Sequence, residues 1–340
     1  MKQTNITFLE LEKWEGKYLQ DKLSKFKNLS LSFFSTPLNN SILGKIKNTN
    51  ILAIFIYSQI DKKVLSQLPN LKFITTMSTG FDQIDLKACQ EKNIKVSNVP
   101  FYGENTVAEH TFALILALSR KLPVSLEKAK KYDFTLDNLR GFDLKGKTLG
   151  IIGLGHIGEH VARMAEGFEM KVIVYDPKKN LKLAKKFGVK YVTLDYLLSH
   201  SDIISLLAPY NKNTHHLINK NNIKLIKKGA YLINTARGGL VETQSLIIAL
   251  NKKILAGAGL DVLEEECFIK EEKELLAKPF QKKIDLKTIL QDHLLIQDQR
   301  VVVTPHNAFN SEEALRRILD TTVENIRAHL KGKLINVVNK

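Results

Sequence analysis

Short apolar runs alternate with amphipathic stretches along the first hundred residues. The apolar runs are of strand length and predict strands at Ile6–Leu9, Leu31–Phe34, Ile51–Tyr57, Phe73–Thr76 and Lys95–Val99. The stretches between them predict helices at Trp14–Phe26, Asn40–Ile46, Lys62–Leu68 and Asp85–Glu91. Because strands that alternate with helices form parallel β-α-β units, this half of the chain predicts a doubly wound parallel sheet.

A long helical pattern, Glu104–Arg120, leads into a second alternating series. This series predicts strands at Thr148–Ile152, Lys171–Tyr175, Ile203–Leu207, Tyr231–Asn234, Ala256–Leu260 and Val301–Thr304. Its predicted helices are Ile157–Gly167, Leu181–Phe187, Leu194–Ser199, Asn221–Ile226, Thr243–Leu250 and, at the end, Ser311–Lys331. The charge-dense segment Cys267–Arg300 predicts one or two surface helices before the last strand. Two such series in 340 residues indicate two α/β domains.

Composition narrows the possible partners and compartment. The chain carries 51 Lys and Arg against 35 Asp and Glu, for a formal charge of +16, but most of the basic residues are lysines scattered along it. This indicates a solvated lysine-rich surface and no nucleic-acid partner, although nucleic-acid binding stays open as a third alternative. The longest apolar run is too short to cross a membrane, and the N-terminus lacks a signal-peptide core. With only Cys89 and Cys267, a reducing cytoplasm is expected.

The strongest motif is Gly153-Leu154-Gly155-His156-Ile157-Gly158, between a predicted strand and helix. Such a turn brings a pyrophosphate to backbone amides at a helix N-terminus, and its glycines allow the tight turn and the close approach. Asp176 ends the next strand, where a carboxylate would accept hydrogen bonds from ribose hydroxyls and repel a 2′-phosphate. The motif therefore predicts NAD rather than NADP.

Three further strands of this series end in residues that suit the reduction of a 2-oxo acid. Arg237 follows one strand, the acids of Asp261–Glu266 follow another, and His306 follows the last. Arginine would bind the substrate carboxylate and polarise its ketone, histidine would donate a proton, and a carboxylate would orient that histidine. A metal site is not expected, since His215 and His216 lack a third ligand at suitable spacing.

Several stretches, in this order, resemble the D-isomer-specific 2-hydroxyacid dehydrogenases, and most of all their D-lactate dehydrogenase branch. They are Ser78–Leu86, Asn98–Gly103 running into Val107–His110, the glycine motif, Asn234–Gly239, Asp261–Glu266 and Thr304–His306. The resemblance implies a Rossmann NAD-binding domain at 103–304, inserted in a flavodoxin-like substrate domain formed by 1–102 and 305–340. It also implies a homodimer that forms through the NAD-binding domain.

The resemblance assigns roles to individual positions. Arg237 would bind the substrate, His306 would be the acid/base and Glu266 its partner, which leaves Glu264 and Glu265 as bystanders. Cofactor contacts would come from Gly153, Gly155, His156, Ile157, Gly158, Asp176, Ala208, Pro209, Thr214, Thr235, Ala236, Arg237 and, near the nicotinamide carboxamide, Asp261. Substrate contacts would come from Tyr57, Thr79, Gly80, Tyr102 and Arg237.

The expected activity is a reversible, NADH-dependent reduction of a small anionic 2-oxo acid, pyruvate first, to the D-2-hydroxy acid. Two alternatives stay open. Reduction of glyoxylate or hydroxypyruvate uses the same residues with a different side-chain pocket. An NAD(H)-sensing interaction protein, like the corepressors that resemble this family, can retain Arg237, Glu266 and His306.

Overall fold

The computed structural model describes residues 3–264, 266 and 286–339. It divides into two compact units, Met1–Tyr102 with Ser311–Lys340 (unit 1) and Gly103–Asn310 (unit 2). The second boundary lies six residues beyond the expected one, because the Asp261 carboxylate of unit 2 accepts hydrogen bonds from the amides of Asn307 and Ala308. No helix in the described residues combines the length and apolarity needed to cross a membrane.

Unit 1 contains a five-stranded parallel sheet with the strand order β2-β1-β3-β4-β5. The strands are β1 (Thr4–Phe8), β2 (Leu29–Phe33), β3 (Ile51–Ile54), β4 (Phe73–Thr76) and β5 (Lys95–Ser97). The helices between them are α1 (Lys13–Leu23), α2 (Asn40–Lys45), α3 (Lys62–Ser66) and α4 (Leu86–Glu91). This is the flavodoxin-like strand order, so that part of the predicted fold is confirmed.

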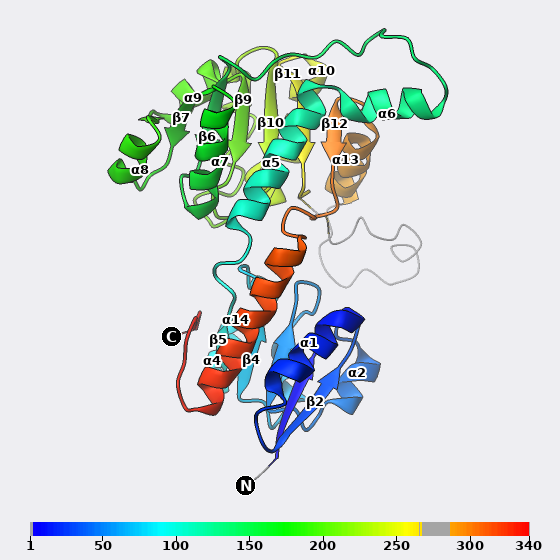
Figure 1. Cartoon of the computed structure of the whole chain (residues 1–340), viewed down its shortest axis with the longest axis vertical. Helices are drawn as coiled ribbons and strands as arrows, with labels where there is room; N and C mark the ends of the chain where they lie inside the picture. Colours follow the sequence, from blue (N-terminus) through cyan, green and yellow to red (C-terminus); the bar gives the residue numbers. More distant parts are fainter. Residues whose placement is uncertain (1–2, 265, 267–285, 340) are drawn as a thin grey trace. The chain divides into compact units, whose positions relative to one another are not determined.

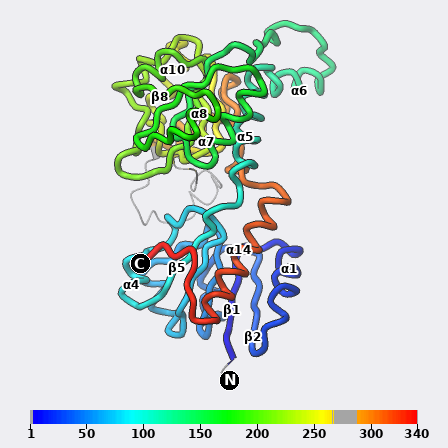
Figure 2. Tube along the Cα trace, turned by 60° about the vertical axis from the view of Figure 1, so that its left-hand side comes forward, coloured from blue at the N-terminus to red at the C-terminus, as the bar shows by residue number. Residues whose placement is uncertain are grey.

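The two strands at the centre of unit 1, β3 and β4, are buried at every residue. They therefore read as unbroken runs of apolar and β-branched residues, as parallel strands covered on both faces require. Helix α14 (Glu312–Leu330) packs against α1 and β4. The C-terminal tail then runs beside β5, where Val337 and Ser97 form an antiparallel bridge (Figure 2). The end of the chain thus completes the unit that the first hundred residues begin.

Unit 2 contains a seven-stranded parallel sheet with the order β12-β11-β10-β9-β6-β7-β8. Its strands are β6 (Thr148–Ile152), β7 (Lys171–Tyr175), β8 (Lys190–Tyr191), β9 (Ile203–Leu206), β10 (Ala230–Asn234), β11 (Leu255–Leu260) and β12 (Val301–Val303). Its helices are α5 (Glu104–Ser119), α6 (Leu122–Lys130), α7 (His156–Gly167), α8 (Leu181–Lys186), α9 (Leu194–His200), α10 (Thr243–Asn251) and α13 (Leu286–Gln297), with 3₁₀ turns η1 (Ile223–Leu225) and η2 (Gly238–Leu240). Helices α5 and α7 lie side by side (Figure 1). Counted from β6, six of the strands follow the 3-2-1-4-5-6 order of a Rossmann sheet, which confirms that prediction.

The strand order reverses between β6 and β9 in unit 2 and between β1 and β3 in unit 1. In doubly wound sheets ligands bind at the carboxyl ends of the strands, at such reversal points. The glycine turn follows β6 and therefore lies at the reversal point of unit 2. Arg237, Asp261 and His306 follow β10, β11 and β12, which are neighbours in the sheet. The glycine turn, Arg237, Asp261 and His306 thus all follow the carboxyl ends of strands of the same sheet.

Two elements differ from the prediction because local side chains compete for backbone groups. Strand β3 ends at Ile54 rather than Tyr57, since the Glu10 carboxylate takes the next backbone amides. The predicted helix Asn221–Ile226 is reduced to η1, where the Asn222 side chain bonds the amide of Asn219 and the carbonyl of Leu217. Asparagine favours such local bonding over a continuous helix.

Helix α6 was not predicted, and its Pro123 looks like a helix breaker in the sequence. The proline occupies the first helical turn, where no intrahelical N–H bond is lost. Of the helices expected in Cys267–Arg300, α13 is described, whereas residues 267–285 lie outside the described residues. Helix α13 is more than a surface helix, because Ile289, Asp292 and Leu295 are buried where it packs against α10 and β12.

Candidate functional site

The glycine turn after β6 has a shape that larger residues would destroy. Gly153 has a φ of +99°, and a Cβ atom there would lie 2.8 Å from the backbone nitrogen of Ala208. A Cβ on Gly158 would collide with the carbonyl oxygen of Gly153. At Gly155, by contrast, a Cβ would meet nothing within 4 Å, so the backbone there borders open space. The turn is therefore tightly packed at Gly153 and Gly158 and open at Gly155.

The open side of this turn suits the pyrophosphate of a dinucleotide. Gly155 caps α7, and His156 and Ile157 form its first turn, so the N-terminal amides of a 12-residue helix border that space. The Asp176 carboxylate accepts hydrogen bonds from the amides of Leu154 (2.8 Å) and Lys178 (2.7 Å). It is thereby fixed beside the turn, with further lone pairs for the two hydroxyls of a ribose. The residues present fit NAD.

The segment after β9 forms the neighbouring wall of this region. Ala208 is buried against Gly153, as the glycine geometry above requires. The Thr214 hydroxyl donates to the carbonyl of Pro209 (2.7 Å) and accepts from the amide of Asn211 (2.8 Å). Thr214 thus shapes the 209–214 loop, while Pro209 itself is exposed.

Strand β10 ends in the segment that carries Arg237. Thr235 is 8% exposed, and its hydroxyl shares a hydrogen bond of 2.9 Å with Thr111 of α5, which ties this segment to the long helix. The Arg237 Nη1 atom donates to the carbonyl of Ala236 (2.8 Å). This bond folds the guanidinium back along its own strand end.

The loop after β12 places His306 against Glu266. The Nδ1 atom of His306 lies 2.6 Å from Oε1 of Glu266, and the other carboxylate oxygen accepts from the amide of Leu263 (3.3 Å). The backbone of His306 is left-handed, with a φ of +51°. Such a conformation is uncommon for a residue other than glycine and is found at sites where the surroundings impose it. The pair leaves Nε2 of the imidazole for another partner.

Asp261 is bonded to this loop on both sides of His306. Its side chain is 1% exposed and accepts hydrogen bonds from the Thr304 hydroxyl (2.6 Å) and from the amides of Asn307 (2.7 Å) and Ala308 (2.9 Å). His110 of α5 lies 3.4 Å away. The carboxylate expected near the nicotinamide carboxamide is therefore enclosed by the loop on both sides of His306, and we propose that it anchors this loop.

Asp261 should also stabilise the fold in a pH-dependent way. Burial raises the pKa of Asp261, but hydrogen bonds from His110, Thr304 and the two amides outweigh it and hold the pKa below its ordinary value. A lowered pKa in the folded state stabilises the protein above pH ~4 and loses that contribution as the pH falls through the folded-state value. We expect Asp261→Asn to cost about 1–3 kcal/mol at pH 7, and less in acid.

Urea unfolding of wild type and Asp261→Asn, at pH 7 and at pH 3, measures this difference. Asp137→Asn is the matched control, because Asp137 is an exposed aspartate of the same unit. A difference that stayed constant or grew in acid would contradict the assignment.

The substrate residues expected in unit 1 follow three neighbouring strands. Tyr57 follows β3 and is 44% exposed, Thr79 and Gly80 follow β4, and Tyr102 lies beyond β5. The Thr79 hydroxyl donates to the carbonyl of Val99 (3.0 Å), which ties the loop after β4 to the segment after β5. All four expected residues therefore lie at the carboxyl edge of the unit 1 sheet.

Sequence reasoning missed the residues that hold these loops in place. The Glu10 carboxylate, at the reversal point of unit 1, accepts from the amides of Phe55, Tyr57 and Ser58. No motif marks Glu10, so no sequence signal could have found it. In unit 2, Glu264 is not the bystander that was expected, because its carboxylate binds the side chains of His216 and Thr243. The sequence shows that Glu264 belongs to a cluster of acids, but it does not show which acid of the cluster binds which partner.

Known proteins resemble this chain over nearly its whole length. Residues 112–308 match the D-isomer specific 2-hydroxyacid dehydrogenase, NAD binding domain. The chain is 32% identical over 327 residues to the D-lactate dehydrogenase of Escherichia coli, with 95% of each chain covered. It is 35% identical over 312 residues to the glyoxylate reductase of Thermococcus litoralis, with 89% of this chain and 88% of the relative covered. The solved structure of D-lactate dehydrogenase from Aquifex aeolicus, complexed with NAD and lactic acid, has a TM-score of 0.85 and 37% identity, with 99% of each chain covered.

The family match covers more than half of the chain and the whole of the glycine turn and its neighbouring loops. It agrees with the Rossmann strand order and with the fit of the glycine turn to NAD. The protein is an NAD-dependent oxidoreductase that belongs to the D-isomer specific 2-hydroxyacid dehydrogenase family.

Proposed function

We propose that the enzyme reversibly reduces a small 2-oxo acid, pyruvate, to the D-2-hydroxy acid with NADH. The observation that carries this proposal is the 2.6 Å pairing of His306 with Glu266 beside the strand end that bears Arg237. A carboxylate-bound imidazole and a guanidinium are the groups that a 2-oxo acid needs for proton donation and for anion binding. The names of the two relatives, glyoxylate reductase and D-lactate dehydrogenase, refer to small acids of this kind, which supports the substrate class.

Each of the three residues has a distinct role in this reaction. NADH, held by the glycine turn and Asp176, would supply the hydride that the carbonyl carbon accepts. Arg237 binds the substrate carboxylate and polarises the carbonyl through its planar fork of donors. His306 donates a proton from Nε2 to the carbonyl oxygen during reduction and removes it during oxidation. Glu266 holds the imidazole by Nδ1 and stabilises its charged form.

We also assign substrate contacts to unit 1. The backbone amides of Thr79 and Gly80 are proposed to bind the substrate carboxylate, and Tyr57 and Tyr102 to surround its small side chain. Glu10 would then act on substrate choice indirectly, because it holds the amide of Tyr57 (2.9 Å).

A substrate panel tests this proposal. NADH consumption is followed at 340 nm with pyruvate, glyoxylate, hydroxypyruvate and bulkier 2-oxo acids, and the chirality of the product is determined. The highest kcat/KM is expected for pyruvate, with D-lactate as product. A preference for glyoxylate or hydroxypyruvate would favour the reductase alternative. NADH binding without turnover of any acid would favour the nucleotide-sensing alternative.

Asp176 should control the choice between NADH and NADPH. Its carboxylate is fixed beside the glycine turn, where a 2′-phosphate would meet a like charge. We expect Asp176→Asn, which removes the charge but keeps one acceptor oxygen, to lower the NADH:NADPH ratio of kcat/KM about thirtyfold. Lys178 and Lys179 lie two and three positions beyond Asp176 and would favour the added phosphate.

Steady-state kinetics with both cofactors measure this ratio. Asp195→Asn, on α9 of the same unit, serves as the control. An unchanged ratio in Asp176→Asn would remove Asp176 from the ribose site.

We further propose that the enzyme works in the cytoplasm as a homodimer that forms through unit 2. The segment after α6 exposes Tyr132, Phe134 and Leu136, each by more than three quarters. Apolar side chains grouped in this way mark interaction surfaces in soluble proteins. Light scattering after gel filtration should give twice the mass of the chain for wild type and a monomer for the triple serine variant. A dimeric triple variant would place the interface elsewhere.

A further inference from the structure

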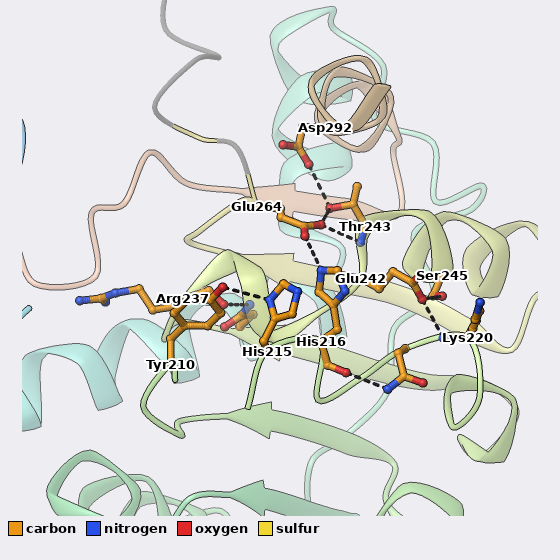
Figure 3. Close-up of polar contacts among 12 residues, drawn as sticks. Tyr210, His215, His216, Lys220, Arg237, Glu242, Thr243, Ser245, Glu264 and Asp292 are labelled. Carbon is orange, nitrogen blue, oxygen red and sulfur yellow. Dashed lines mark hydrogen bonds and ion pairs between the residues drawn. The ribbon is translucent and has the colours of Figure 1, made fainter. Parts of the chain in front are cut away.

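Three turns meet beside the proposed catalytic residues of unit 2. They are the turn that ends in His216, the turn from Arg237 to Thr243, and the turn after β11 that bears Glu264 (Figure 3). The first two are joined along the backbone: the amide of His216 donates to the carbonyl of Gly239 (2.8 Å), and that of Ile218 donates to Leu240 (3.0 Å). The third turn is joined to both by one side chain, that of Glu264.

The Glu264 carboxylate lies between His216 and Thr243 (Figure 3). One of its oxygens pairs with Nε2 of His216. The other accepts from the hydroxyl (2.8 Å) and the backbone amide (3.2 Å) of Thr243, at the start of α10. The Glu264 side chain is only 17% exposed, so these bonds are shielded from water.

The peptide next to Glu264 links the two proposed catalytic elements. Gly238, the residue after Arg237, packs directly on the carbonyl of Leu263, where a Cβ atom would collide. The amide of the same Leu263 donates to the carboxylate of Glu266, which pairs with His306. Any movement of Leu263, which precedes Glu264, would therefore displace the Arg237 turn through the Leu263 carbonyl and Glu266 through the Leu263 amide.

We propose that Glu264, clamped by His216 and Thr243, is a positioning residue for the reaction. It fixes the turn that bears Glu266 against the turn that bears Arg237, and so sets how the substrate-binding guanidinium lies relative to the proton donor. The inference rests on the proposed function of Arg237, Glu266 and His306. Misplacement of a reacting group by about 1 Å can cost about a hundredfold in rate, so a clamp of this kind has a measurable effect.

The test compares Glu264→Ala with Glu264→Gln in the full-length enzyme. Alanine removes all the bonds, whereas the glutamine amide can still accept from Thr243 and donate to His216. For Glu264→Ala we expect kcat to fall about 10- to 100-fold and the KM of the 2-oxo acid to rise about tenfold. Glu264→Gln should recover to within about fivefold of wild type, because the geometry is retained. The Kd for NADH should change by no more than a few-fold in both variants, since the glycine turn and Asp176 lie at other strands.

The control is Glu242→Ala, which removes a neighbouring carboxylate that bonds Ser245 and the amide of Lys220 (Figure 3). It should leave kcat and both KM values within about twofold of wild type, as expected for a group outside the clamp. If Glu264→Ala fails to fold, Thr243→Val keeps the buried shape, removes the hydroxyl donor and should raise the KM of the 2-oxo acid in the same direction. NADH titration counts the folded sites in every variant.

A merely structural role would lower the number of NADH sites and leave the KM values of the remaining enzyme unchanged, and this result overturns the proposal. So would wild-type kinetics in Glu264→Ala, or a Glu264→Gln variant as impaired as the alanine. Binding of oxamate, an unreactive isostere of pyruvate, to the NADH complex separates this inference from the proposed function. Weaker oxamate binding in Glu264→Ala supports the clamp even if no acid is turned over. A wild type that neither reacts nor binds oxamate removes both.

Discussion

Replacing His306 by alanine is expected to lower kcat for 2-oxo acid reduction by about 10³-fold, within the range that general acid catalysis contributes. The imidazole is the group at this strand end that can donate a proton, and its Nδ1 atom is already held by Glu266 at 2.6 Å. NADH binding should be unchanged, because the glycine turn follows β6 whereas His306 follows β12. Stopped-flow turnover and a fluorescence titration with NADH measure the two quantities.

Glu266→Gln should have a smaller effect in the same direction, about 10- to 100-fold in kcat, since the amide still contacts the imidazole but no longer stabilises its charged form. His200→Ala is the matched control, because this histidine of unit 2 contacts Ser199 and the carbonyl of Tyr196 in its own helix, α9. Turnover near the wild-type value in His306→Ala would remove His306 from the chemistry. A control as impaired as His306→Ala would show that the loss came from general destabilisation.

Replacing Arg237 by alanine should lower kcat/KM for the 2-oxo acid by about 10³-fold or more, equivalent to about 4 kcal/mol of transition-state stabilisation. The guanidinium is proposed to contact both the carboxylate and the carbonyl, so KM should rise and kcat should fall together. Arg237→Lys keeps the charge but loses the planar fork, and about a tenfold recovery over alanine is expected. Neither variant should alter the Kd for NADH more than a few-fold.

Kinetics across a range of 2-oxo acid concentrations separate the two parameters. Arg316→Ala is the control, because this exposed arginine of α14 pairs with Glu312 and belongs to unit 1. A rise in KM with an unchanged kcat would limit Arg237 to binding the carboxylate. Wild-type values for both parameters would exclude it from the substrate site.

Much of this architecture could be predicted from local patterns. Alternating strand-sized and helix-sized segments predict two doubly wound sheets, and the glycine motif predicts which sheet binds the dinucleotide. These signals are local, because a buried strand or a tight turn restricts the residues that form it. Helix α6 was missed although its signals are also local. It follows Lys121, whose backbone is left-handed, and includes Pro123, which looks like a helix breaker in the sequence.

Clustered acids show where prediction from the residues alone reached its limit. Asp261, Glu264 and Glu266 lie within six residues, and spacing does not reveal which of them meets a histidine. The family resemblance singled out Glu266, and the structure pairs it with His306. It also gives Asp261 the amides of the His306 loop and gives Glu264 the side chains of His216 and Thr243. These acids have different partners because side chains at different positions of a turn point in different directions.

By itself the sequence determined the fold class, the nucleotide-binding turn and the three strand ends that carry Arg237, the acids and His306. It could do so because backbone geometry and strand burial act over a few residues. Only the tertiary structure decided which loops are held together. Glu10 reaches the amides after β3, and Glu264 joins three turns, through contacts between residues that lie 20 to 50 positions apart in the chain. Such contacts follow from the strand order, which no single segment of the chain encodes.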